Sequence, residues 1–285
     1  MSKYSANSLC IKSRHMARIQ AACKEAGIYV SLGFAEKVGE SLYMAQALIS
    51  RSGEIVNKRH KIMPTGLERV VYGNATENSI NNVTETPLGR IGHLQCWEHI
   101  QPLLKFNTIS QGEQIHVAAW PALFPHLGFE PFSMADEGCE IISRTYAIEA
   151  QAFVIMSTSL ITAENAAAVG LDFGANGPPA GTFFQPPGGG RAGVFAPDGR
   201  KLTQTVPADR EAIIYCDIDL SLCSQAKLLA DPVGHYVRPD LLRLVANNAL
   251  PKLVSSHDAT PVPIPTPIPV PGLPEDVDAM KDESV

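Results

Sequence analysis

The hydrophobic positions of the first hundred residues switch between helical and strand spacing. In "SRHMARIQAACKEAG", apolar side chains recur at three- and four-residue steps from Met16 to Cys23, which predicts a helix that ends at Gly27. The apolar runs "IYVSLGFAE", "SLYMAQALIS" and "IVNKRHKI" predict three strands, with a hairpin turn at 51–54. A further strand, "GRIGHLQC", ends at Cys96, and helical spacing resumes just beyond it.

The second half of the chain continues this alternation. "QIHVAAWP" predicts a buried strand, "DEGCEIISRTYAIEAQA" a helix with an acidic first turn, and "FVIMSTS" another strand. Residues 161–193 are rich in Gly, Pro and Ala and predict a long loop, while "AGVFAPDGRKLTQTV" and "EAIIYCDIDL" predict a second hairpin-like pair. Helices that alternate with apolar strands indicate an α/β domain, which we assign to residues 1–250. The proline-rich, terminally acidic remainder, 251–285, predicts a disordered tail.

Composition narrows the possible partners. The 285 residues are 45% apolar and 18% charged, which is enough apolar material for a substantial core. The net charge of −6, without a Lys/Arg stripe, gives no reason to expect nucleic acid as a partner. No apolar run reaches membrane-spanning length, and the N-terminal residues lack the apolar core of a secretory signal. Six scattered cysteines without CxxC spacing favour reduced thiols, so we expect a cytoplasmic protein away from membranes.

The stretch "HLQCWEH" at 93–99 raises three interpretations of Cys96. A buried, inert thiol is common for an intracellular cysteine. A metal site with His93 and His99 is disfavoured, because strand side chains three residues apart point to opposite faces, and we expect no metal. A nucleophile is favoured by the start of a helix at the sulfur, where backbone amides stabilise a thiolate and a developing anion. In that case His99 or His116 could serve as a base, and the residues alone leave this pairing open.

Several separated stretches resemble the carbon–nitrogen hydrolase (nitrilase) superfamily, and in particular nitrilases of the fungal and bacterial type. They lie between about residues 5 and 245, in the order of the family, and read "VSLGFAEKVGESLYMAQALISRSGEIV", "KRHKIMPTGLERVVYG", "GRIGHLQCWEHIQPLLKF", "GEQIHVAAWP", "YAIEAQAFV" and "AKLLADPVGHYVRPDLLRL". The resemblance implies a four-layer α-β-β-α sandwich that lacks the family's first β-α-β unit at its N-terminus. It also implies a homo-oligomer built as a spiral of dimers.

The resemblance assigns roles to particular residues. Cys96 matches the nucleophile, Lys61 rather than Lys58 matches the lysine that stabilises charge, and Glu68 matches a supporting acid or base. Trp97, His99, Trp120 and Pro121 are expected to border the substrate pocket. The implied reaction converts a nitrile to a carboxylic acid and ammonia through a thioimidate and a thioester on Cys96, without a cofactor. "CWEH" is more similar to nitrilases than to cyanide hydratases, which carry "CWEN".

One expected residue has no match in this chain. The family's general base is a glutamate followed by an aromatic-Gly-Tyr-Pro turn, and Glu25, Glu36 and Glu40 do not fit that pattern. General-base assistance is worth about 10²–10⁴-fold in rate. Two alternatives to an active nitrilase therefore remain. One is a catalytically impaired assembly subunit, and the other is a nitrile or cyanide hydratase that releases an amide.

Overall fold

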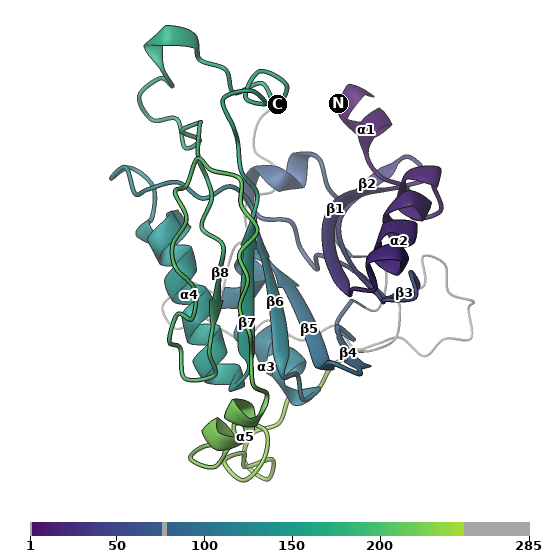
Figure 1. Ribbon diagram of the computed structural model, residues 1–285. Helices are drawn as coiled ribbons and strands as arrows, with labels where there is room; N and C mark the ends of the chain where they lie inside the picture. The colour runs from purple at the N-terminus through teal and green to yellow at the C-terminus, as the bar shows by residue number, and fades with distance from the viewer. Residues whose placement is uncertain (1, 76–78, 248–285) are drawn as a thin grey trace, which may run out of the picture. The chain divides into compact units, whose positions relative to one another are not determined.

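The computed structural model describes residues 2–75 and 79–247 (Figure 1). The predicted tail at 251–285 lies outside the described residues, and the division at residue 250 stays a prediction. The helices are α1 (Ser2–Asn7), α2 (Arg14–Ala26), α3 (Pro102–Ser110), α4 (Asp136–Ala150) and α5 (Ser221–Lys227). The strands are β1 (Val30–Val38), β2 (Ser41–Ile49), β3 (Ile55–His60), β4 (Val83–Thr86), β5 (Gly89–Gln95), β6 (Ile115–Trp120), β7 (Phe153–Thr158) and β8 (Gly193–Phe195). Short 3-10 helices are η1 (Gly66–Val70), η2 (Cys96–Ile100), η3 (Phe132–Met134) and η4 (Gly174–Asn176).

The predicted N-terminal helix and the three strands after it form one unit. The side chain of Ser13 accepts the Met16 N–H at the start of α2, and Gly27 ends the helix in the left-handed region at φ 66°. β1, β2 and β3 form an antiparallel sheet in that order. α2 covers its outer face, where Met16 and Cys23 pack with Ile49. The predicted helix, strands and hairpin are all confirmed.

The second sheet contains five strands in the order β4-β5-β6-β7-β8. β5, β6 and β7 are parallel, while β4 and β8 pair antiparallel at its two edges. The parallel strands are connected by α3 and α4, which carry apolar side chains onto the outer face of this sheet. That core includes Leu94, Ala118 and Met156 from the strands, with Leu104 and Tyr146 from the helices.

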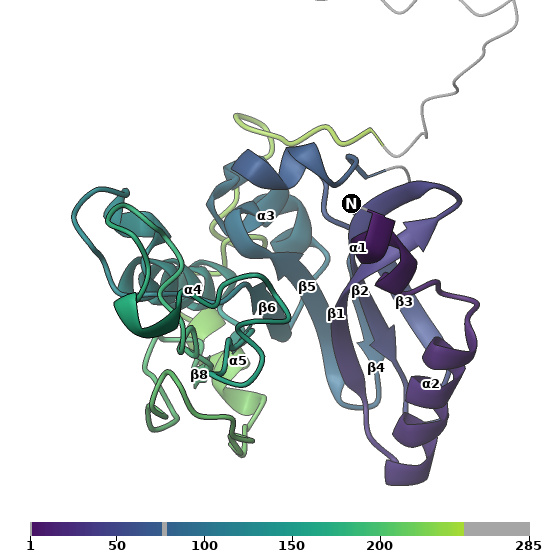
Figure 2. The same ribbon diagram turned by 90° about the horizontal axis from the view of Figure 1, so that it is seen from above.

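The two sheets pack face to face. Leu48 of β2 lies in one apolar cluster with Ile91, Ile115 and Val117 of the second sheet. Two polar contacts cross the same interface, from Gln46 to the Leu94 carbonyl and from Ser31 to His93. The layers therefore run α2, three-stranded sheet, five-stranded sheet, α3 with α4 (Figures 1 and 2). This confirms the predicted α/β class and its α-β-β-α layering.

One predicted strand is wrong. "EAIIYCDIDL" alternates as a strand should, but residues 211–219 form no ladder, and Ile213 and Tyr215 are largely exposed. β8 pairs with β7 on one side and Phe195 bridges to Lys201, so the backbone groups of β8 are already engaged by other residues. Among the described residues, no helix is long and apolar enough to cross a membrane.

Candidate active site

Two chain segments meet where β3 and β5 end. Lys61 follows β3 directly, and Cys96 follows β5 directly. An ion pair between Arg59 and Glu98 joins these segments, with nitrogen–oxygen distances of 2.6 and 2.7 Å and both side chains buried. Glu98 also accepts the backbone N–H of Ile62 at 2.9 Å and of Gln95 at 2.8 Å.

These four bonds occupy both oxygens of the Glu98 carboxylate. Burial by itself would raise its pKa, but the Arg59 charge and the four hydrogen bonds outweigh burial and lower the pKa instead. Because Ile62 and Gln95 are the direct neighbours of Lys61 and Cys96, Glu98 holds the lysine segment against the cysteine segment. Glu98 is thus fully engaged as an acceptor and cannot also take a proton from substrate or thiol.

Lys61 and Glu68 form a second ion pair next to this clamp. Lys61 Nζ lies 2.6 Å from Glu68 Oε2, and the lysine side chain is almost fully buried. The same oxygen accepts the Thr65 N–H at 2.6 Å, in a capping box at the start of η1. Glu68 Oε1 makes no hydrogen bond to any residue in 2–75 or 79–247, and the side chain is one-quarter exposed. Lys58 instead binds Glu36.

Cys96 has an unusual backbone conformation. Its φ is +51°, a left-handed value that costs a non-glycine residue about 1–2 kcal/mol, and it lies at the junction of β5 and η2. The backbone N–H of Trp97 acts on the cysteine sulfur and lowers the pKa of the thiol. Burial nevertheless raises the pKa of the thiol to about 11, because desolvation outweighs the nearby Lys61 charge and the Trp97 N–H. The amide at the start of η2 thus acts in the expected direction, but burial is the larger effect on the pKa of Cys96.

A cavity of about 430 Å³ opens beside the sulfur. Cys96 and Glu68 both line it, and Trp97, Trp120 and Pro121, which were predicted to border the pocket, lie around it. The other lining residues are mostly apolar: Thr65, Gly66, Leu67, Leu123, Phe129, Glu130, Met134, Cys139, Phe183 and Phe184. A cavity of this size with apolar walls and a few polar groups suits a small organic molecule.

His99 lies elsewhere. It is buried, it is not among the lining residues, and its Nδ1 lies 2.6 Å from the Cys96 carbonyl oxygen. Its Nε2 lies 3.0 Å from His116 Nε2, and His116 Nδ1 lies 2.7 Å from Glu113. The structure therefore directs neither histidine to the Cys96 sulfur, and the Cys–His pairing that the sequence left open does not form.

Most of the lining residues missed from the sequence come from two segments; the others are Thr65, Gly66 and Leu67 at the start of η1 and Cys139 of α4. Leu123, Phe129, Glu130 and Met134 belong to the connection from β6 to α4, and Phe183 and Phe184 belong to the long loop at 161–193. Neither segment has a hydrophobic period, so no pattern marks these side chains as pocket residues. The pair of aromatic residues in an otherwise Gly- and Pro-rich loop was the one available signal.

Glu36 and His93 have partners other than the Cys96 sulfur. Glu36 is buried and binds Lys58 and His60, at 3.0 and 2.7 Å. His93 faces Ser31 of the opposite sheet, as the strand-face argument predicts. Within 2–75 and 79–247, no group of three His, Cys, Asp or Glu side chains is arranged to hold a metal ion.

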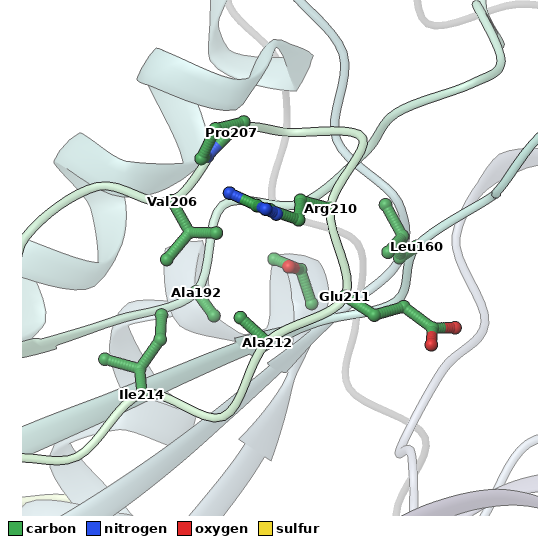
Figure 3. Close-up of a pocket in the computed structure, with 10 residues that line it drawn as sticks. Leu160, Ala192, Val206, Pro207, Arg210, Glu211, Ala212 and Ile214 are labelled. Carbon is green, nitrogen blue, oxygen red and sulfur yellow. The ribbon is translucent and has the colours of Figure 1, made fainter.

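A second cavity, of about 230 Å³, lies near the end of β7 (Figure 3). Its walls include Leu160, Ala192, Val206, Ala212 and Ile214, with the guanidinium end of Arg210 turned toward Val206 and Pro207. The carboxylate of Glu211 points away from it. No thiol lines this cavity, so the Cys96 pocket is the candidate for covalent chemistry.

Comparisons with known proteins agree with this geometry. Residues 2–228 match the carbon–nitrogen hydrolase family. The chain is 45% identical over 252 residues to an arylacetonitrilase of Hypocrea virens, covering 88% of this chain and 74% of that protein. It is 46% identical over 260 residues to an arylacetonitrilase of Aspergillus kawachii (91% and 77% covered) and 44% identical over 257 residues to a nitrilase of Talaromyces marneffei (89% and 78%).

Solved structures confirm the fold. A carbon–nitrogen hydrolase of Helicobacter pylori aligns with a TM-score of 0.60 at 17% identity, covering 81% of this chain and 77% of that one. The NitFhit protein of C. elegans aligns with a TM-score of 0.61 at 20% identity, covering 82% and 52%. With a matching family over most of its length, relatives at about 45% identity and the same layered fold, this chain belongs to the carbon–nitrogen hydrolase family.

Proposed function

We propose that this protein hydrolyses an aryl-substituted nitrile to a carboxylic acid and ammonia, with Cys96 as the nucleophile. The observation that carries the proposal is that one pocket brings together Cys96, Glu68 and a wall of five aromatic side chains: Trp97, Trp120, Phe129, Phe183 and Phe184. Aromatic walls favour an aryl group through apolar contact and ring stacking. The names of the relatives, arylacetonitrilase and nitrilase, agree with this substrate class.

The first half of the reaction forms a covalent thioimidate. The raised pKa of Cys96 means that the thiol carries its proton at neutral pH, so a base takes that proton as the sulfur attacks the nitrile carbon. Two residues that line the pocket carry a carboxylate oxygen without a hydrogen bond to a described residue, Glu68 Oε1 and Glu130 Oε2. We assign the role of base to Glu68, because its charge acts on the Cys96 thiol. Lys61 and the Trp97 N–H stabilise the negative charge that develops on the nitrile nitrogen.

The second half releases both products. Water adds to the thioimidate carbon, the carbon–nitrogen bond breaks and ammonia leaves, which converts the thioimidate to a thioester. A second water then cleaves the thioester, releasing the carboxylic acid and restoring the Cys96 thiol. We propose Glu68 as the group that relays each proton. It passes the thiol proton to the nitrile nitrogen, the protons of the first water to the departing ammonia, and a proton of the second water to the Cys96 sulfur. No step needs an oxidant, a reductant or a cofactor.

The location and assembly of the protein belong to the same proposal. Scattered free cysteines agree with a cytoplasmic location, and the family resemblance agrees with a homo-oligomer. The substrate is a small molecule that fits the cavity of about 430 Å³.

The test is to incubate the purified chain with an arylacetonitrile and with a short aliphatic nitrile, using Cys96→Ala as the control. Ammonia and acid from the aryl substrate, absent in Cys96→Ala, would support the proposal. Amide as the main product would assign the chain as a hydratase. A covalent adduct without turnover, or a folded protein with neither adduct nor product, would favour the impaired assembly subunit.

A further inference from the structure

A buried chain of hydrogen bonds extends from the nucleophile into the core, and the proposed reaction does not use it. His99 Nδ1 is 2.6 Å from the Cys96 carbonyl oxygen, and His99 Nε2 is 3.0 Å from His116 Nε2. His116 Nδ1 is 2.7 Å from Glu113 Oε2, and the Tyr146 hydroxyl donates to Glu113 Oε1 at 2.5 Å. The four side chains are at most 1% exposed, and we call this set, His99, His116, Glu113 and Tyr146, the relay.

The positions of its protons follow from donor and acceptor chemistry. A carbonyl oxygen only accepts, so His99 carries a proton on Nδ1. Burial lowers the pKa of His99 well below its usual value, aided by repulsion from His116 and from the Arg59 and Lys105 charges, so the ring is neutral and its Nε2 accepts. His116 must then donate from its own Nε2. A single proton is shared between His116 Nδ1 and Glu113 Oε2.

The first bond of the relay acts on the group that contacts the sulfur. The Cys96 carbonyl and the Trp97 N–H belong to the same planar peptide unit, so a bond that fixes the oxygen also fixes the direction of the N–H. That N–H acts on the Cys96 sulfur, where it lowers the pKa of the thiol. A hydrogen bond at the carbonyl also polarises the peptide and strengthens the N–H as a donor.

We infer that His99 is a positioning residue, which the relay holds in place so that the Cys96–Trp97 peptide directs its N–H at the nucleophile. Two further contacts support this role. The ring of Trp120, which lines the pocket, stacks on His99 with centroids 5.3 Å apart, and Tyr146 packs on His116 at 4.0 Å. Support from both sides also explains how Cys96 keeps its left-handed φ, because such a conformation persists where the surrounding structure enforces it.

The consequence for the thiol can be measured without a nitrile. The groups that act on the Cys96 sulfur are Lys61, Glu68 and Glu98, together with the Trp97 N–H. If the N–H loses its direction, the thiolate loses a donor. We expect His99→Ala to slow alkylation of Cys96 by iodoacetamide about tenfold between about pH 7 and 9, which corresponds to about one unit in the pKa. Peptide mass spectrometry separates Cys96 from the other five cysteines.

Two isosteric variants keep the test decisive if His99→Ala does not fold. The amide nitrogen of Asn occupies the place of His Nδ1, and that of Gln occupies the place of Nε2. His99→Asn should therefore retain the bond to the Cys96 carbonyl and alkylate within about threefold of the wild type, while His99→Gln should resemble His99→Ala. Equal alkylation rates in Asn and Gln variants with matching circular dichroism spectra would overturn the inference.

Glu113 supplies a second matched pair. In Glu113→Gln, the amide can donate to His116 Nδ1 and still accept from Tyr146, so the relay stays complete without a charge. Glu113→Leu breaks both bonds. We expect the Glu113→Gln variant to alkylate Cys96 at nearly the wild-type rate and the Glu113→Leu variant to do so clearly more slowly. The opposite order of rates would contradict the positioning role of His99.

The inference rests on the proposed function only for its effect on turnover. With an active wild type, His99→Ala should lower kcat by about tenfold or more while KM changes little, because His99 itself does not line the pocket. If the wild type proves inactive on nitriles but Cys96 alkylation still depends on His99, the proposed function fails and the positioning role stands. If the wild type turns over nitriles but the His99 variants alkylate Cys96 at the wild-type rate, the positioning role is wrong and the proposed function stands.

Discussion

At the residue scale, the site depends on the difference between two neighbouring lysines. Lys61 and Lys58 lie three positions apart in an extended segment, so their side chains point to opposite faces of the sheet. Lys61 reaches Glu68 beside the cysteine pocket, whereas Lys58 binds Glu36 on β1. Burial raises the pKa of Cys96. The Lys61 charge is the largest effect that stabilises the thiolate and lowers this pKa.

Replacing Lys61 by Met should lower activity by about 10²–10³-fold, because the charge on the nitrile nitrogen loses its partner. It should also slow alkylation of Cys96, since the Lys61 charge lowers the pKa of that thiol. Ammonia release and the alkylation rate measure the two effects. Lys58→Met is the matched control, and similar losses of activity in two folded variants would contradict the assignment of Lys61.

At the element scale, buried polar contacts hold the ends of β3 and β5 together. Glu98 of η2 binds Arg59 of β3. It also accepts the backbone N–H groups next to Lys61 and next to Cys96. Such a pair adds little stability relative to apolar residues, but breaking it leaves an unpaired buried charge. The Arg59–Glu98 pair instead fixes the end of β3, next to Lys61, relative to the end of β5, next to Cys96.

Glu98→Gln should therefore cost about 3–5 kcal/mol of unfolding free energy, because Arg59 stays buried without a counter-charge. Denaturant unfolding measures the loss. The exposed pair of Arg200 with Asp198 provides the comparison, where Asp198→Asn should cost less than about 1 kcal/mol. A cost for Glu98→Gln as small as that of Asp198→Asn would show that water reaches and solvates Arg59.

The turn between β2 and β3 offers a second test at this scale. Gly53 has φ +82°, and a Cβ there would lie 2.6 Å from the Gln20 carbonyl oxygen of α2. Gly39, in the turn between β1 and β2, has φ +58° and open space around it. Both alanine variants suffer backbone strain of about 1 kcal/mol, but Gly53→Ala must also separate α2 from the turn. We expect Gly53→Ala to unfold at clearly lower denaturant than Gly39→Ala, and equal midpoints would contradict this.

At the scale of the whole molecule, the pocket joins a sheet edge to two irregular segments. β6 supplies Trp120, η2 supplies Cys96 and Trp97 at the end of β5, and the connections supply Phe129, Phe183 and Phe184. Three of the five aromatic wall residues therefore lie on connections, where specificity can vary without altering the core.

Phe184→Ala should raise KM for an arylacetonitrile by about 10-fold or more while leaving a short aliphatic nitrile nearly unchanged, because only the aryl ring reaches that wall. Steady-state kinetics on the two substrates measures the difference. Phe132, which is half-exposed and does not line the pocket, provides the control substitution to Ala. Equal effects on both substrates would indicate a general loss of structure and not a specificity wall.

The hydrophobic pattern predicted most elements for a simple reason. α2 and α4 each bury one stripe, whereas β2 is a continuous apolar run that is buried at consecutive positions between two layers. Both patterns are present directly in the order of residues. The pattern was misleading at residues 211–219, where alternation predicted a strand. A ladder also requires a neighbour with free N–H and C=O groups, which the local sequence does not encode.

The sequence by itself determined the layered α/β fold, the family and which residue types react. The hydrophobic period, the order of the motifs and the chemistry of each side chain are all properties of the chain before it folds. Tertiary structure alone decided how those residues are used. It buried Cys96 and raised the pKa of its thiol, turned His99 to the backbone of Cys96, and engaged Glu98 with Arg59. These outcomes depend on desolvation and on partners that are distant in the sequence. Arg59 lies 39 positions from Glu98, and His116 lies 17 positions from His99, and these pairs meet only in the folded chain.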